Sequence, residues 1–165
     1  MTAIIMTRAL VVSAESAQVV DLPGGGAFTL FADASDTGGA LGANRLTLGP
    51  GREGAKPHYH TLSTEVFHVL GGEMEFLLGE KVTTVAKGGL VIVPPGLPHA
   101  FGAAPGTGAD LLVVLTPGVE RFGYFRRLAR VQHGLEPADG LLREQDRYDL
   151  HSVDAPAWRT ERRSE

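Results

Sequence analysis

Short apolar segments, separated by glycine and proline, follow one another from about residue 27 to residue 116. Residues 27–31 have the aromatic and β-branched character of a strand, and residues 111–115 form the continuous apolar run typical of a buried strand. Residues 36–39 (Asp-Thr-Gly-Gly) predict a turn, and the Gly71-Gly72 pair predicts a hairpin turn. Short strands joined by glycine-rich turns predict an all-β sandwich or barrel.

The hydrophobic period changes after residue 116. Thr116-Pro117 predicts a helix start, because a hydroxyl caps the first turn and proline is favoured at the first helical position. Apolar residues then recur at helical spacing, at Val119, Phe122, Phe125 and Leu128. Gly134 predicts the end of this helix, and residues 137–149 predict a second, weaker one. We therefore expect one or two C-terminal α-helices after the β-rich part.

A single domain is the simplest organisation for residues 1–165. We expect a barrel core at about 27–116, a helical extension at about 117–150 and a charged tail at 151–165. Arginines alternate with glutamates near the end of the chain, which predicts a solvated tail rather than an anion site.

Composition excludes several functions. The formal net charge of -4 and the lack of a basic run give no indication of nucleic-acid binding. No segment approaches the roughly 20 apolar residues of a membrane span, and the N-terminal residues lack the features of a secretory signal, so we expect a cytoplasmic protein. Without cysteine the chain has no disulfide or thiolate chemistry, and nitrogen and oxygen must hold any metal.

Two histidines, His58 and His60, lie one residue apart, and in an extended strand their side chains point the same way. Glu65 follows five residues later, and His99 lies on a different segment. We interpret the four as a 3-His-1-carboxylate site for one divalent transition metal, which would be Fe, Mn, Ni, Co, Cu or Zn because all accept these ligands. The alternative is that the histidines are structural or lie on the surface, and that Glu65 lies beside the metal or on the surface.

The spacing of these residues resembles that of a known family. His58-x-His60-x4-Glu65-x6-Gly72 is similar to the first signature of the cupins, and Gly88-x5-Pro94-x-Gly96-x2-His99 is similar to the second. The resemblance implies a double-stranded β-helix, or jelly-roll, barrel, and it identifies the four residues as metal ligands. Two positions depart from the pattern, Arg52 in place of the opening glycine and Ala103 in place of the closing asparagine, and neither is a ligand.

Among cupins, the residues 36–39 and the aromatic, basic helix after the barrel resemble small bacterial quercetin 2,3-dioxygenase-like proteins. That resemblance implies a dioxygenase that cleaves an aromatic or enediol-type substrate with O2, with Glu65 as general base. It also implies a homodimer.

Strand alternation predicts the surroundings of the metal. If Glu65 faces inward, Phe67 does too, while His68 faces outward. We expect a pocket for an apolar or aromatic small molecule lined by Phe67, Met74, Phe76 and Phe101. The alternative is that these four residues are simply core. Tyr124, Tyr148 and Trp158 would either cover the barrel mouth or pack, and His133 and His151 are expected to be solvated.

Two other functions fit the same ligands. The first is an oxygen-independent metal enzyme, such as an isomerase, a decarboxylase or a polyketide-type cyclase. The second is a non-catalytic module in which a metal orients a ligand or stabilises the barrel. A shared fold does not distinguish among these functions.

Overall fold

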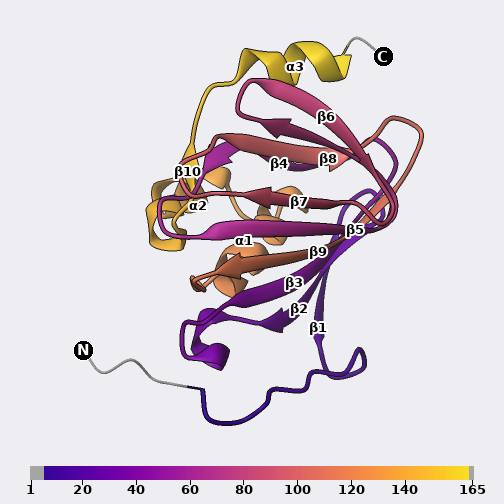
Figure 1. Ribbon diagram of the computed structural model, residues 1–165. Helices are drawn as coiled ribbons and strands as arrows, with labels where there is room; N and C mark the ends of the chain where they lie inside the picture. Colours follow the sequence, from indigo (N-terminus) through magenta and orange to yellow (C-terminus); the bar gives the residue numbers. More distant parts are fainter. Residues whose placement is uncertain (1–5, 164–165) are drawn as a thin grey trace.

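The computed structural model describes residues 6–163 (Figure 1). Residues 1–5 and 164–165, which belong to the predicted domain and tail, lie outside the described residues. The strands are β1 (Gln18–Leu22), β2 (Gly26–Ala32), β3 (Gly42–Leu48), β4 (Glu53–Tyr59), β5 (Thr64–Leu78), β6 (Lys81–Ala86), β7 (Leu90–Val93), β8 (His99–Ala103), β9 (Ala109–Thr116) and β10 (His151–Ser152). The helices are α1 (Phe122–Gln132), α2 (Ala138–Arg143) and α3 (Pro156–Arg163), with 3-10 turns η1 (Ala34–Thr37) and η2 (Gln145–Tyr148).

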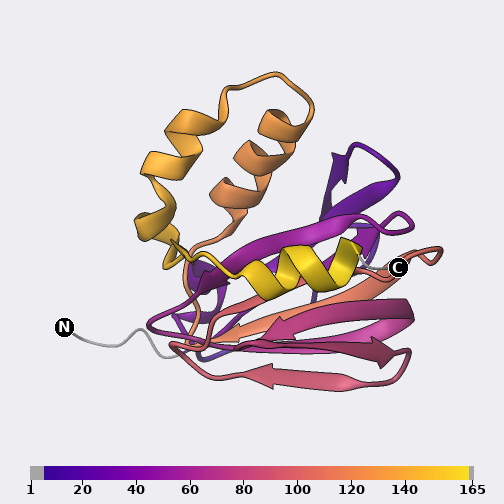
Figure 2. The ribbon, with the colours of Figure 1, turned by 90° about the horizontal axis from the view of Figure 1, so that it is seen from above.

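The strands form one curled antiparallel sheet in the order β1-β2-β3-β9-β5-β8-β4-β10, with β6 and β7 paired to β5. The all-β jelly-roll fold predicted from the sequence is thereby confirmed. Three helices follow the barrel where one or two were expected, and α1 packs against α2 while α3 lies apart from both (Figure 2).

Strand β5 runs through the Gly71-Gly72 pair without turning back, so the predicted hairpin at this pair is wrong. The first half of β5 pairs with β9 and β7, and its second half pairs with β8 and β6. Gly72 has a φ of 68°, and a Cβ atom at this position would overlap with the main-chain oxygen of Gly108. The glycine therefore permits a bend in β5 and a close approach between the main chain of β5 and that of Gly108.

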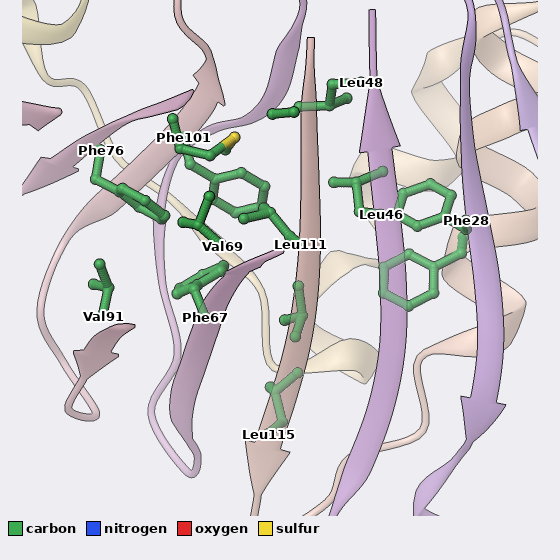
Figure 3. Close-up of a cluster of buried hydrophobic side chains, with 14 of the residues drawn as sticks. Phe28, Leu46, Leu48, Phe67, Val69, Phe76, Val91, Phe101, Leu111 and Leu115 are labelled. Carbon is green, nitrogen blue, oxygen red and sulfur yellow. The ribbon is translucent and has the colours of Figure 1, made fainter. Parts of the chain in front are cut away.

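The inward-facing rows of the strands form the core (Figure 3). The ring of Phe67 packs edge-on against Phe76 and Phe101, with centroid distances of 5.2 and 4.9 Å. Phe28 on β2 stacks on Phe125 of α1 at 4.4 Å, which joins the helix to the sheet. In the first half of β5 burial follows the predicted alternation, with Glu65 and Phe67 buried and His68 half-buried, whereas residues 74–77 in the second half are all buried.

Helix α1 begins at Phe122 and not at Thr116-Pro117, so the predicted helix start is wrong. The carboxylate of Asp33 accepts hydrogen bonds from the main-chain nitrogens of Arg121 (2.7 Å) and Phe122 (3.1 Å). An acid that is distant in sequence therefore satisfies the first turn of the helix, as a local capping residue would.

Helix α3 covers the outer face of the second half of β5, in a segment expected to be solvated. Trp158 is 3% exposed and packs with Leu77 and Ala100. Arg162 Nε lies 3.2 Å from the buried carboxylate of Glu75, and its guanidinium lies over the Trp158 ring. The expectation that Arg162 is solvated is therefore wrong, because an amphipathic helix shields it.

Candidate metal centre

Three strands bring the predicted ligands to one point inside the barrel. His58 lies near the end of β4, and His99 is the first residue of β8. The two residues are paired in the antiparallel register of these strands. Glu65 lies near the start of β5, and His60 follows β4 directly. All four are between 1% and 4% exposed, and they offer ligand atoms that lie within 4.8 Å of one another. The four residues predicted from sequence spacing are thus placed together.

Each imidazole is held by a main-chain carbonyl through Nδ1. The Nδ1 distances are 2.6 Å from His58 to Lys56 O, 2.6 Å from His60 to Asp149 O and 2.9 Å from His99 to Leu97 O. A carbonyl oxygen only accepts hydrogen bonds, so each Nδ1 carries a proton and donates it. In a neutral ring this leaves the lone pair on Nε2, which is the state in which histidine binds a metal.

The Nε2 atoms of His60 and His99 both meet Glu65 Oε2, at 3.0 and 2.8 Å. Lone pairs on neutral rings and a carboxylate oxygen repel at these distances unless a positive charge lies among them. A divalent cation bound by three Nε2 atoms and one carboxylate would satisfy all four groups at once. The donor set therefore fits a transition metal.

The electrostatics of the site follow from burial and from these contacts. Burial raises the pKa of Glu65, but without a metal the contacts with His60 and His99, when these rings also carry a proton on Nε2, outweigh this and hold the pKa well below its usual range. Burial, with a contribution from His99, lowers the pKa of His58 to about 3. His58 is therefore neutral, and Glu65 ionised, at neutral pH.

Asp149 supports the site, although nothing in the local sequence pattern indicated it. Its main-chain oxygen accepts the His60 hydrogen bond, and its carboxylate accepts from Thr61 N, Thr61 Oγ1 and Leu62 N at 2.6 to 3.1 Å. Asp149 is buried and has a φ of 51°, an uncommon conformation for a residue other than glycine. The segment after η2 thus fixes both the ring of His60 and the loop that follows it.

A cavity of about 650 Å³ lies between the inner face of the sheet and the helices α1 and α2, and both His58 and Glu65 line it. Its volume suits a small organic ligand. Its remaining wall is mostly apolar, with buried polar side chains at Asn44, Arg121 and Tyr124. The three polar residues were not singled out as ligand contacts from the sequence. Only Asn44, a polar residue in the inward row of an apolar strand, carried a signal of that kind.

Of the predicted pocket residues, Phe101 lines this cavity. Phe67, Met74 and Phe76 are fully buried in the core and do not line it. The aromatic and apolar wall comes instead from Phe28, Leu46, Val113, Phe125, Leu128 and Leu141. All four side chains face the inside of the barrel, but strand alternation did not distinguish the residues of the core from those of the cavity wall.

The other histidines and aromatic residues lie apart from the four ligands. His133 Nε2 lies 3.0 Å from Asp21 O, and His151 contacts the carboxylate of Asp149 at 3.1 Å rather than being fully solvated. Tyr124 lines the cavity, Tyr148 packs against it at 5.4 Å, and Trp158 packs on the outer face of the sheet.

Comparisons with known proteins agree with this architecture. Residues 44–116 match the Cupin domain family, and no curated protein matches the chain. An RmlC-like cupin from Shewanella frigidimarina is 22% identical over 67% of this chain and 93% of its own, with a TM-score of 0.56. The polyketide cyclase RemF from Streptomyces resistomycificus is 24% identical over 68% and 80%, with a TM-score of 0.53. A Streptomyces nucleoside dehydratase is 14% identical over 67% and 83%, with a TM-score of 0.53.

These likenesses concern the fold, and none of them supports the narrower resemblance to quercetin 2,3-dioxygenases. Within residues 6–163, no helix is long and apolar enough to cross a membrane. The barrel, the match over residues 44–116 and the buried cluster of three histidines and one glutamate agree with one another. The barrel has the cupin fold, and residues 44–116 match the Cupin domain family.

Proposed function

We propose that this protein is a metal-dependent enzyme that acts on a small, largely apolar organic molecule, with Glu65 as the proton acceptor. The observation that supports the proposal most strongly is that all three Nδ1 atoms are bound to carbonyls, so that the Nε2 atoms are left for a cation. A divalent transition metal held by His58, His60, Glu65 and His99 would act as a Lewis acid toward a substrate oxygen. The ligands suit Fe, Mn, Ni, Co, Cu or Zn.

The residues around the cavity would divide the remaining work. The ionised Glu65 lies in the cavity wall, where it can take a proton from an acidic group of the bound substrate. Phe28, Leu46 and Phe101 provide an apolar wall that excludes water and strengthens the charge interactions of the site.

Proton removal is a step that two reaction classes share. The dioxygenase predicted from the sequence would follow it with ring cleavage by O2. An oxygen-independent isomerase, decarboxylase or cyclase would follow it with rearrangement. The names of two proteins with similar folds, a nucleoside dehydratase and a polyketide cyclase, favour the second class.

The test is turnover of metal-loaded protein with a panel of flavonols, enediols and polyphenolic acids, with and without oxygen. Oxygen uptake that Glu65→Gln abolishes would support the dioxygenase, and anaerobic turnover with zinc would support the second class. Absence of turnover with every metal, combined with a fall in melting temperature on chelation, would contradict catalysis and leave a non-catalytic binding module.

The assembly and location of the protein stay predictions from the sequence. We propose one domain over residues 1–165, a homodimer and a cytoplasmic location. Light scattering of the purified protein tests the dimer.

A further inference from the structure

Arg121 is a buried cation without a counter-ion. Its side chain is 6% exposed, and Nε and Nη1 are buried without a hydrogen-bond partner. No carboxylate in the described part of the chain forms an ion pair with it. Asp33, which binds the main-chain nitrogen of Arg121, is occupied by main-chain donors. Burying a charge without a counter-ion lowers the stability of the fold, so Arg121 points to a role other than stabilisation.

Two aromatic rings of α1 hold the guanidinium in place. Its central carbon lies 5.7 Å from the centroid of the Tyr124 ring and 5.5 Å from that of Phe125. The faces of the rings attract the cation. They do not accept hydrogen bonds from its N–H groups, which lie in the plane of the guanidinium. The hydrogen-bonding capacity of Nε and Nη1 is therefore unused within the described part of the chain.

Arg121 lines the same cavity as His58 and Glu65. A molecule in this cavity would meet the proposed metal ligands on the strand side and Arg121 on the helix side. Among the described residues, the ion-pair contacts of Glu65 are with His60 and His99 and not with Arg121. The cavity thus has a buried, positively charged position in a mostly apolar wall, in addition to Arg52 and Lys56, which are not fully buried.

The geometry points to Arg121 as the anchor for a carboxylate group of the substrate, which makes the substrate class a small aromatic or apolar organic acid. Planar guanidinium groups pair with carboxylates through charge-assisted hydrogen bonds. The role of Arg121 in turnover rests on the proposed function, whereas the binding of a carboxylate at this position does not.

The test is calorimetric titration with benzoate and phenylacetate against their primary amides, on both metal-free and zinc-loaded protein. The wild type is expected to prefer each carboxylate, and Arg121→Gln should weaken carboxylate binding on the order of 10- to 100-fold with little effect on the amides. Arg126→Gln is the matched control, because Arg126 lies in the helix α1 that Arg121 precedes, is exposed and does not line the cavity. Equal carboxylate affinity in wild type and Arg121→Gln, or no preference in the wild type, would overturn the inference.

A stability measurement separates ligand binding from a structural role. Arg121→Met removes an unpaired buried charge and keeps most of the packing, so its melting temperature should equal or exceed that of the wild type. A marked fall would show that protein contacts hold Arg121, and would overturn the inference. The metal-free titration is informative even if no metal binds, so failure of the proposed function is distinguishable from failure of this inference.

Discussion

The Nδ1 atom of His60 lies 2.6 Å from the main-chain oxygen of Asp149, a residue 89 positions away in the chain. The C-terminal segment therefore orients a ligand of the proposed metal site in the barrel. The carboxylate of Asp149 adds a second connection, to Thr61 and Leu62. These hydrogen bonds connect the C-terminal extension to the barrel at the proposed metal site.

Asp149→Ala should weaken both the fold and the metal site. The variant leaves the main-chain N–H groups of Thr61 and Leu62 without their acceptor, so we expect a loss of about 2–4 kcal/mol in the free energy of unfolding. The variant keeps the main-chain oxygen that holds His60, but the carboxylate no longer fixes this segment against the loop at Thr61 and Leu62. His60 is then oriented less firmly, so metal affinity should fall about 10- to 100-fold. Urea unfolding and a competitive metal titration measure the two effects. Asp146→Ala, at a side chain 87% exposed, should change neither, and an unchanged metal affinity in Asp149→Ala would contradict the account.

Acidification should destabilise the metal-free protein through His58. Folded His58 stays neutral down to about pH 3, because its pKa is lowered to about 3, whereas an unfolded histidine binds a proton near pH 6.5. Between these values the unfolded state binds more protons, so stability falls as the pH is lowered, by at most about 1.4 kcal/mol per pH unit from this residue. Urea unfolding at about pH 7, 6 and 5 should show a shallower dependence in His58→Gln. Parallel curves for the two proteins would argue against a buried neutral His58.

Arg162→Ala should destabilise the protein from a position on the last helix. The change removes the cation 3.2 Å from buried Glu75, and also the group that lies 4.7 Å over the Trp158 ring. We expect a loss of roughly 3 kcal/mol in the free energy of unfolding. Arg159→Ala removes an exposed arginine of the same helix, which pairs with exposed Asp154, and should cost less than about 1 kcal/mol. Equal effects would mean that α3 does not shield Arg162.

Gly72→Ala tests the bend in β5. Its positive φ and the approach of Gly108 leave no room for a methyl group, so we expect a loss of more than about 2 kcal/mol or failure to fold. Gly71→Ala is the matched control, since a Cβ atom there would lie 3.5 Å from Asp110 Cβ, an ordinary contact. Thermal unfolding of both variants makes the comparison, and similar melting temperatures would contradict the bend.

The sequence predicted what depends on local spacing. The ligands His58, His60 and Glu65 follow from the alternation of one strand and its next neighbour, and His99 follows from a motif of fixed length. Residues that face inward in β5 were also predicted correctly, because side chains alternate in any strand.

Features set by distant segments could not be predicted in this way. The start of α1 is determined by Asp33, and the Gly71-Gly72 pair bends a strand because the main chain at Gly108 packs against it. Phe67 and Phe101 both face the inside of the barrel. Whether each of them contacts the core or lines the cavity depends on where the helices α1 and α2 pack. The same holds for Arg121, which in the sequence is one arginine among several.

The metal content of the purified protein shows whether His58, His60, Glu65 and His99 bind an ion. Elemental analysis of protein purified without added metal, and again after incubation with each of Fe, Mn, Ni, Co, Cu and Zn, should find close to one ion per chain. His99→Ala should lose that ion, while His68→Ala, at a histidine outside the cluster, should keep it. If the wild type retains none of these ions, or if His99→Ala retains as much as the wild type, the four residues do not form a metal site.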